Sequence, residues 1–121
     1  MPVMAASSST KTAVVAGALG VIGRYIVERL AALPDWQVVG LSRRKGEDRD
    51  RVRHVSVDLL DAADLERKLA DLGEATHVFY CAFQAVGTQA ADYARGISVN
   101  RDMLVNTVSA IERVAKRLER V

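Results

Sequence analysis

The chain has 121 residues, of which half are apolar and 26% are charged, and its formal net charge is +2. This length suits a single domain with one core, and so small a net charge argues against nucleic acid or an anionic membrane surface as a partner. Cys81 is the single cysteine, so the chain can form no internal disulfide. His54 and His77 each stand alone at the head of an apolar run, which favours strand-entry residues over metal ligands.

No apolar stretch of the sequence is as long as a membrane span, so the cytoplasm is the expected location. The first ten residues are small and polar and lack the charged and apolar parts of a signal peptide. We expect residues 1–10 to be a disordered leader and residues 11–121 to be one domain.

Strand and helix patterns alternate along this domain. The predicted strands are 12–16, 36–43, 53–60 and 76–83. The first predicted helix spans 21–33 and stops before Pro34, with an apolar face of Val21, Ile22, Tyr25, Ile26, Leu30 and Leu33. The second follows Asp61, which can cap it, and ends at Gly73. The third runs over 93–118, with Ile97, Leu104, Val108, Ile111, Ala115 and Leu118 on one face.

The predicted strands are continuous apolar runs and do not alternate with polar residues. This pattern is typical of a parallel sheet that is covered by helices on both faces. The sequence therefore predicts a three-layer α/β fold with a mostly parallel sheet of about four strands. One crossover is reduced to the charged loop at 44–52.

The segment AGALGVIG joins the first strand to the first helix and carries three glycines at G-x-x-G-x-x-G spacing: Gly17, Gly20 and Gly23. A strand, a glycine turn and a helix in this order are typical of a dinucleotide-binding turn, whose backbone approaches a pyrophosphate at the helix N-terminus. Leu19, Val21 and Ile22 belong to the same predicted site. The alternative is a glycine turn that serves packing only.

The second strand ends in LSRR, so Ser42, Arg43 and Arg44 stand where an NAD site usually carries an acidic residue. Two guanidinium groups suit a 2′-phosphate, and each charge-assisted hydrogen bond contributes about 1.5–3 kcal/mol. The predicted cofactor is therefore NADP(H). The alternative is that both arginines are only solvated in a loop.

Two further strand ends contribute residues to the predicted cofactor site. Asp58 follows the third strand and could accept a hydrogen bond from the adenine amino group, with Leu59 against the ring. The alternative for Asp58 is a turn or capping residue. The fourth strand ends in Cys81, Ala82 and Phe83, which would line the cleft, although a lone strand cysteine is also typical of a small buried hydrophobe.

Taken in order, AGALGVIG, LSRR, VDLLD, THVFY and VNRDMLVNTVSAI resemble the extended short-chain dehydrogenase/reductase superfamily. The resemblance is to the atypical branch that includes progesterone 5-beta-reductase and iridoid synthase, and it extends from about Lys11 to the last residue. Asn100 and Asn106 belong to the resemblance. It implies a Rossmann fold, NADPH, and hydride transfer to an activated C=C or carbonyl. The glycine motif departs from the family pattern at Ala16 and Leu19, where threonine or serine is usual.

The catalytic Tyr and Lys that the resemblance implies have no match in this sequence. Residues four positions after Tyr25, Tyr80 and Tyr93 are not lysine, and the first two tyrosines fall in elements expected to be core. The chain is thus interpreted as the NADP(H)-binding portion of a reductase that is inactive alone. A non-catalytic binding or regulatory module and an inactive truncation are the alternatives.

The predicted fourth strand lies at a sheet edge, where exposed backbone groups recruit partners. We therefore expect self-association through this edge, and a stable monomer at high concentration would count against it. Residues 84–92 form either a lid over the cofactor or a plain surface loop.

Overall fold

The structure is a computed structural model that describes residues 10–121, so the leader expected at 1–10 lies outside the described residues except for Thr10. The strands are β1 (Lys11–Ala16), β2 (Trp36–Ser42), β3 (Val52–Ser56) and β4 (His77–Tyr80). The helices are α2 (Val21–Ala31), α3 (Ala62–Lys68), the 3₁₀ turn η1 (Ala90–Asp92) and α4 (Tyr93–Val114). Among the described residues no helix is long and apolar enough to cross a membrane.

The four strands form one parallel sheet in the order β3-β2-β1-β4. Strand β1 lies inside the sheet, and four of its residues, from Ala13 to Ala16, are fully buried. Burial of both faces of a parallel sheet explains why its strands read as continuous apolar runs. The predicted parallel α/β fold is confirmed, including the short connection from β2 to β3 without a helix.

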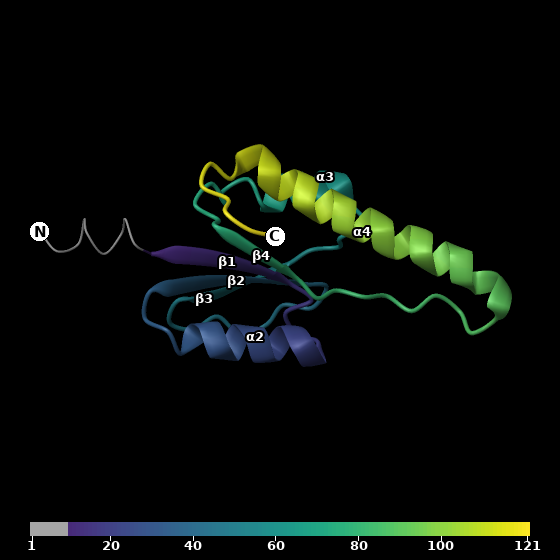
Figure 1. The fold of residues 1–121 in the computed structure, drawn as a ribbon, viewed down its shortest axis with the longest axis horizontal. Coiled ribbons are helices and arrows are strands. Elements are labelled where there is room, and N and C mark those ends of the chain that lie inside the picture. Colours follow the sequence, from purple (N-terminus) through teal and green to yellow (C-terminus); the bar gives the residue numbers. More distant parts are fainter. Residues whose placement is uncertain (1–9) are drawn as a thin grey trace, which may run out of the picture.

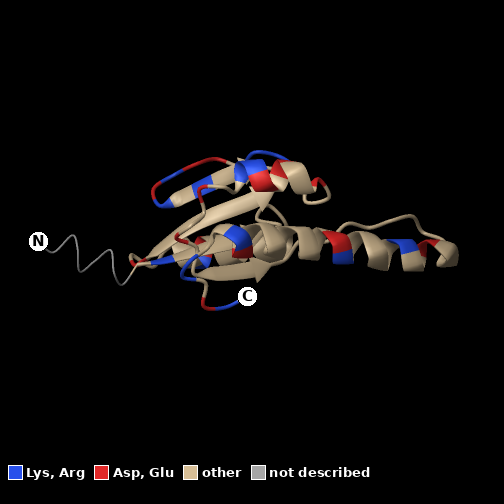
Figure 2. Cartoon of the chain, turned by 90° about the horizontal axis from the view of Figure 1, so that it is seen from above, with Lys and Arg blue, Asp and Glu red and all other residues tan. Residues whose placement is uncertain are grey.

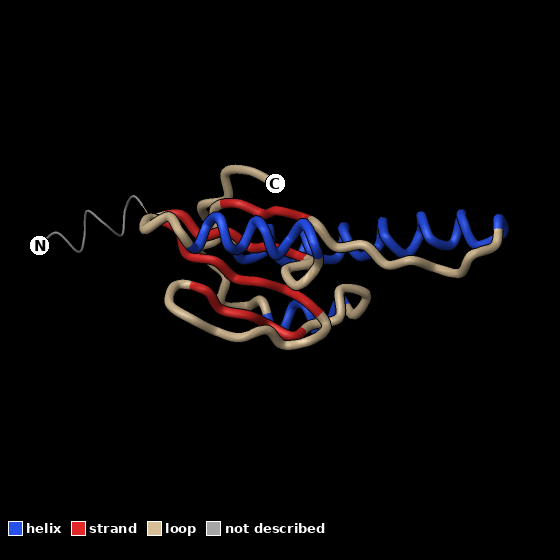
Figure 3. Tube along the Cα trace, turned by 90° about the horizontal axis from the view of Figure 1, so that it is seen from below, coloured by secondary structure: helices blue, strands red, loops and turns tan. Residues whose placement is uncertain are grey.

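Helices cover both faces of the sheet: α2 lies on one face, and α3 and α4 lie on the other (Figure 1). One apolar cluster joins β1 and β2 to α2 through Val27 and Leu30. The larger cluster packs Leu65 of α3 and Ile111 of α4 against the opposite face. The N-terminal half of α4 and the loop before it project beyond the sheet, side by side (Figures 1 and 3).

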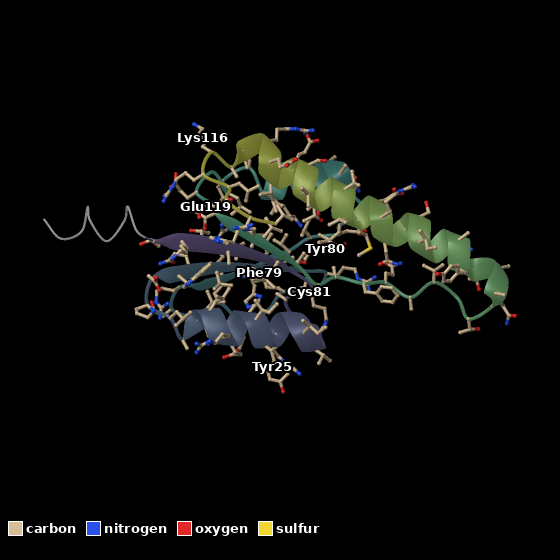
Figure 4. All side chains as sticks on the ribbon, viewed as in Figure 1. Tyr25, Phe79, Tyr80, Cys81, Lys116 and Glu119 are labelled. Atoms are coloured by element: carbon tan, nitrogen blue, oxygen red, sulfur yellow. The ribbon has the colours of Figure 1, made fainter. Side chains whose placement is uncertain are left out.

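The predicted apolar face of α2 is wrong in its first turns. Gly23, Val27 and Leu30 face the sheet, whereas Val21 and Ile22 are exposed and Tyr25 is 72% exposed. Figure 4 shows Tyr25 pointing away from the sheet. The reason is that the glycine, not the bulky side chains, faces inward and lets the helix axis approach the first turn closely.

The predicted face of α4 is wrong in its first half and right at Ile111, which is fully buried, and the predicted end of the helix is wrong. Its buried residues are Met103, Thr107, Ala110 and Ile111. Ile97 is exposed in the N-terminal half of the helix, which projects beyond the sheet, and Leu104 is exposed although its neighbour Met103 is buried. The helix ends at Val114 and not at 118, since Ala115 takes an extended backbone conformation with ψ 122°.

Several other element ends differ from the predicted ones. Strand β3 ends at Ser56 rather than at 60, and β4 ends at Tyr80 rather than at 83, because the chain bends into cleft loops there. Helix α3 ends at Lys68, before Gly73, but Asp61 caps it as predicted by accepting from the Asp64 N–H at 3.0 Å.

The end of the chain pairs with β4. The Glu119 N–H donates to the Thr76 carbonyl at 2.7 Å, and the Val78 N–H donates to the Arg120 carbonyl at 2.9 Å. Arg120 thereby forms a parallel bridge with His77. The edge predicted to recruit partners is thus covered in part by the chain itself, and self-association stays a prediction.

Arg51 forms hydrogen bonds near the C-terminal end of α2, although the two are far apart in the sequence. Its guanidinium donates to the carbonyls of Ala31 at 3.0 Å, Leu33 at 2.8 Å and Trp36 at 3.1 Å. Helix ends leave such carbonyls without partners inside the helix, and this one side chain binds three carbonyls between the end of α2 and the start of β2. Arg51 itself has a φ of 61°, a conformation that is uncommon for residues other than glycine.

Candidate dinucleotide site

The turn between β1 and α2 requires glycine at two positions, because a side chain there would collide with the backbone. Gly17 has a φ of 81°, and its N–H donates to the Leu41 carbonyl at 2.9 Å. A Cβ at Gly17 would lie 2.8 Å from the backbone nitrogen of Ala82, and one at Gly23 would lie 2.0 Å from the Gly17 carbonyl oxygen. The first glycine therefore lets β1 and the end of β4 meet, and the third lets α2 begin directly against the turn.

The backbone N–H groups at the N-terminus of α2 bind no capping side chain and have no acidic residue beside them in the first turn. Gly20 is the N-cap residue, no side chain caps the helix, and its first turn contains no acidic residue. The first N–H groups of a helix lack partners within the helix, and together with the helix dipole they favour an anion. This end of α2 thus offers backbone donors to a phosphate group.

A cleft of about 530 Å³ lies at the carboxyl ends of the strands, a volume in the usual range for a ligand pocket. All four strand ends contribute to it. Its predicted lining residues are Gly17, Gly20, Val21, Ile22, Ser42, Arg43, Asp58, Leu59, Cys81, Ala82 and Phe83. Leu41, Val57, Gln84 and Met103 line it as well and were not predicted.

A second, shallower hollow continues the cleft over the end of β2 and includes two more predicted residues, Leu19 and Arg44. Gly23 lines neither hollow and acts on the site only by packing. Ile22 and Phe83 are largely exposed at the cleft, which leaves apolar surface open to a ligand.

Two serine hydroxyls fix the backbone of the arginine pair. Ser42 at the end of β2 donates to the Arg44 carbonyl at 2.7 Å, and Ser56 at the end of β3 donates to the Arg43 carbonyl at 2.7 Å. Both arginine side chains are exposed, and neither guanidinium forms an ion pair with a described residue. Two unneutralised positive charges therefore lie beside the glycine turn.

The other cations of the same basic run are each paired with a carboxylate. Lys45 pairs with Asp48, Arg49 with Glu28, and Arg53 with Asp71. Figure 2 shows the same mixture of blue and red on the outer surface of the fold. Arg43 and Arg44 are therefore the two cations of this run that form no ion pair with a described residue.

Asp58 lies at the cleft with its carboxylate exposed. One carboxylate oxygen accepts from the Leu60 N–H at 3.0 Å, which fixes the side chain in a tight turn. Asp58 is therefore a turn residue, as the predicted alternative had it. The same turn also fixes the direction of its second carboxylate oxygen. Helix capping falls to Asp61 instead.

A family comparison decides what kind of cleft this is. The sequence profile of the NAD dependent epimerase/dehydratase family matches residues 13–121. The chain belongs to the NAD dependent epimerase/dehydratase family. The resemblance to short-chain dehydrogenases/reductases that the motifs indicate is thereby confirmed, and the chain is a nucleotide-binding portion of this family.

Curated relatives of this epimerase/dehydratase-family chain include plant enzymes. An (S)-8-oxocitronellyl enol synthase of Nepeta cataria is 32% identical over 108 residues, which are 82% of this chain and 26% of that protein. A 3-oxo-Delta(4,5)-steroid 5-beta-reductase of Arabidopsis thaliana is 30% identical over 122 residues, 94% of this chain and 30% of that protein. The chain spans between a quarter and a third of the length of these relatives.

Solved structures share the fold. A short chain dehydrogenase family protein from Francisella tularensis superposes with a TM-score of 0.71 at 15% identity, over 88% of this chain and 47% of that one. A short chain dehydrogenase from Leptospira borgpetersenii, solved with bound NAD+, gives a TM-score of 0.70 at 16% identity, over 87% and 46%. These similarities confirm the Rossmann-type fold.

Two asparagines of α4 form hydrogen bonds to the backbone of loops that line the cleft, and this role was not predicted from the sequence. The Asn100 side chain accepts from the Gln84 N–H at 2.8 Å and donates to the Gln84 carbonyl at 2.9 Å and the Gly96 carbonyl at 2.8 Å. Asn106 donates to the Leu59 carbonyl at 3.1 Å. The sequence could have indicated this role, because both asparagines fall inside a predicted helix, where asparagine is unfavourable without such a partner.

Cys81 and Tyr80 mark the less polar side of the cleft. Burial raises the pKa of the Cys81 thiol, so the neutral thiol is favoured, and the residue is half-buried as a small apolar group would be. Burial also raises the pKa of Tyr80, whose hydroxyl is buried without a hydrogen-bond partner among the described residues. Both groups lie at the end of β4 (Figure 4) and stay neutral at neutral pH.

Proposed function

We propose that this chain binds NADP(H) in the cleft, with the pyrophosphate at the glycine turn and the 2′-phosphate at Arg43 and Arg44. The observation that carries the proposal is the unpaired state of these two guanidinium groups at the end of β2, where no acidic residue stands. An acid there would hold a ribose 2′-hydroxyl, whereas two cations favour an added phosphate. Asp58 and Leu59 line the same cleft, and we assign them to the adenine.

The residues present fit a dinucleotide on physical grounds. Side chains at Gly17 and Gly23 would collide with backbone atoms of the turn, and the open N-terminus of α2 supplies donors without an acidic competitor. Cys81, Ala82 and Phe83 border the other end of the cleft with mostly apolar surface. When bound, the cofactor supplies a nicotinamide that carries hydride; this chain orients it and excludes water from one side.

Hydride transfer to an enone or carbonyl is the reaction we propose for the longer protein in which this portion acts. The described tyrosines do not supply the catalytic hydroxyl: Tyr25 and Tyr93 are largely exposed outside the cleft, and the Tyr80 hydroxyl is buried. A non-catalytic dinucleotide-binding or regulatory module is the second candidate, and the same unpaired arginines support it.

Calorimetric titration of the purified chain with NADPH and NADH at one fixed salt concentration tests the binding proposal. We expect NADPH to bind at least about tenfold more tightly, since loss of one charge-assisted hydrogen bond changes affinity by that factor or more. The Arg43→Ala/Arg44→Ala variant should lose this preference and keep NADH affinity.

A charge-matched control separates local contacts from overall charge. Arg29 and Lys116 are exposed, lie outside the cleft and form no ion pair with a described residue. Arg29→Ala/Lys116→Ala removes the same charge and should leave the preference for NADPH intact. Equal affinity of the wild-type chain for both cofactors would overturn the assignment of NADP(H).

A further inference from the structure

His54 lies beneath the loop that presents the two arginines, and it lines neither hollow of the cleft. The sequence suggested a strand-entry residue, but His54 is in the middle of β3 and only 8% exposed. Its imidazole is enclosed by two glycines. A Cβ at Gly40 of β2 would lie 2.8 Å from Nδ1, and a Cβ at Gly46 of the loop would lie 2.7 Å from the same atom.

The backbone of His54 holds the same loop by two further contacts. Its N–H donates to Asp48 Oδ1 at 2.8 Å, and its carbonyl accepts from Lys45 Nζ at 3.2 Å. Lys45 Nζ also donates to Asp48 Oδ1 at 3.1 Å, which closes a small network over the ring. His54 therefore contacts the loop at three positions shortly after the arginine pair: Lys45, Gly46 and Asp48.

The imidazole of His54 contributes to the fold by packing and not through a hydrogen bond of its Nδ1 atom to a described residue. Nδ1 is buried without a hydrogen-bond partner among the described residues, and such a group costs free energy that an apolar ring would avoid. What the ring does provide is a flat surface on which Gly46 rests, so that Lys45 and Asp48 reach the His54 backbone. The position of the loop is thus set by packing from below as well as by Ser42 and Ser56.

We propose that His54 is a positioning residue for recognition of the 2′-phosphate: it fixes the loop over 43–48 and so sets the preference for NADP(H) without contacting the cofactor. This inference rests on the proposed function. Preorganised donors hold a charged group better than mobile ones, because a mobile loop must be ordered when the ligand binds. Loss of the contacts beneath the loop should therefore weaken 2′-phosphate binding and leave binding of the rest of the nucleotide unchanged.

Two fragments isolate the effect: adenosine 2′,5′-bisphosphate, which carries the 2′-phosphate, and adenosine 5′-monophosphate, which lacks it. The readout is the dissociation constant of the monophosphate divided by that of the bisphosphate. Partial unfolding does not change this ratio, because it lowers both apparent affinities equally. We expect Gly46→Ala, which forces the loop off the ring, to reduce this ratio by about fivefold or more, the equivalent of one hydrogen bond.

Gly73→Ala is the matched control, since its Cβ would meet only the Val114 carbonyl oxygen at an ordinary 3.5 Å. This variant should leave the ratio unchanged. His54→Ala should reduce the ratio as Gly46→Ala does, and the double variant should reduce it no further, because both changes remove the same contact.

The Asp48→Ala variant distinguishes a positioning effect on bisphosphate binding from an effect of charge alone. Because Asp48 is exposed, this variant can also replace a core variant that does not fold. It removes a negative charge near the arginines and frees Lys45, so electrostatic attraction alone predicts tighter bisphosphate binding. Positioning predicts weaker binding. A wild-type chain without any preference would refute the proposed function, whereas a wild-type preference that survives in Gly46→Ala and Asp48→Ala would overturn only the role of His54.

Discussion

The carbonyl oxygen of Gly17 fills the space that a side chain at Gly23 would need, with only 2.0 Å between that oxygen and a Cβ built on Gly23. The two glycines are six residues apart, yet they form one contact in which the first turn of α2 rests on the bend after β1. This contact sets both the direction of the helix and the place where its free N–H groups point.

Gly23→Ala should therefore destabilise the chain by about 3 kcal/mol, since the backbone oxygen cannot move away as a flexible side chain could. Urea unfolding measures the change. Gly96→Ala is the matched control: it also lies within a helix, and its Cβ would approach only Val86 at 3.8 Å. Alanine there should be neutral or slightly stabilising, and equal losses in both variants would contradict the proposed clash.

The asparagines of α4 should control two loops independently. Asn100→Ala removes the bonds to Gln84, so amide exchange in 84–92 should accelerate about 5- to 30-fold, as expected for 1–2 kcal/mol of lost local stability. Asn106→Ala should instead affect the segment around Leu59. Hydrogen exchange read by mass spectrometry tests the pair, and each variant is the control for the other.

His54 should make the stability of the fold depend on pH. Burial lowers the pKa of His54 from its ordinary 6.5, with help from Lys45 and Arg49, while Asp48 opposes the shift. The unfolded chain thus binds a proton more readily than the folded one, so stability is full above pH 6.5 and falls as the pH drops from 6.5 toward the folded-state pKa.

Urea midpoints at pH 7.5 and 5.5 measure this loss, and His54→Phe, which keeps an aromatic ring and cannot be protonated, should remove most of it. The pKa of Asp48 is lowered, chiefly by the hydrogen bond from the His54 backbone, so its own effect falls below its ordinary 3.8, outside this window. Identical slopes for wild type and His54→Phe would contradict the assignment to this residue.

Arg51 should contribute to stability through the three carbonyls that it binds between the end of α2 and the start of β2. Arg51→Ala is expected to cost about 2–3 kcal/mol, because three hydrogen bonds from a charged donor are lost, although the Leu33 carbonyl keeps the Trp36 N–H as a donor. Arg51→Lys should not restore the stability, since an ammonium group lacks the planar fork of the guanidinium. Thermal unfolding followed by circular dichroism compares the three proteins, and full rescue by lysine would show that charge alone matters.

The sequence by itself determined the order of strands and helices, the parallel sheet and the family. These follow from short-range patterns: apolar runs that must be buried on both faces, glycines where Gly17 and Gly23 have no room for a Cβ, and Asp61 before a helix. The residues that line the cleft could also be predicted from the sequence, because parallel strands place their carboxyl ends at one edge of the sheet. Gly23 was the exception, since it packs beneath the turn and lines no hollow.

Only the tertiary structure decided which helix faces are buried and what lies behind the site. Tyr25 and Ile97 match an apolar helical pattern, but the close approach at Gly23 and the projection of α4 past the sheet leave them exposed. The contact of His54 with Gly46, and the bonds from Asn100 and Asn106 to distant loops, join residues that no sequence pattern relates. Such contacts depend on how layers pack, and local periodicity carries no information about a partner in another layer.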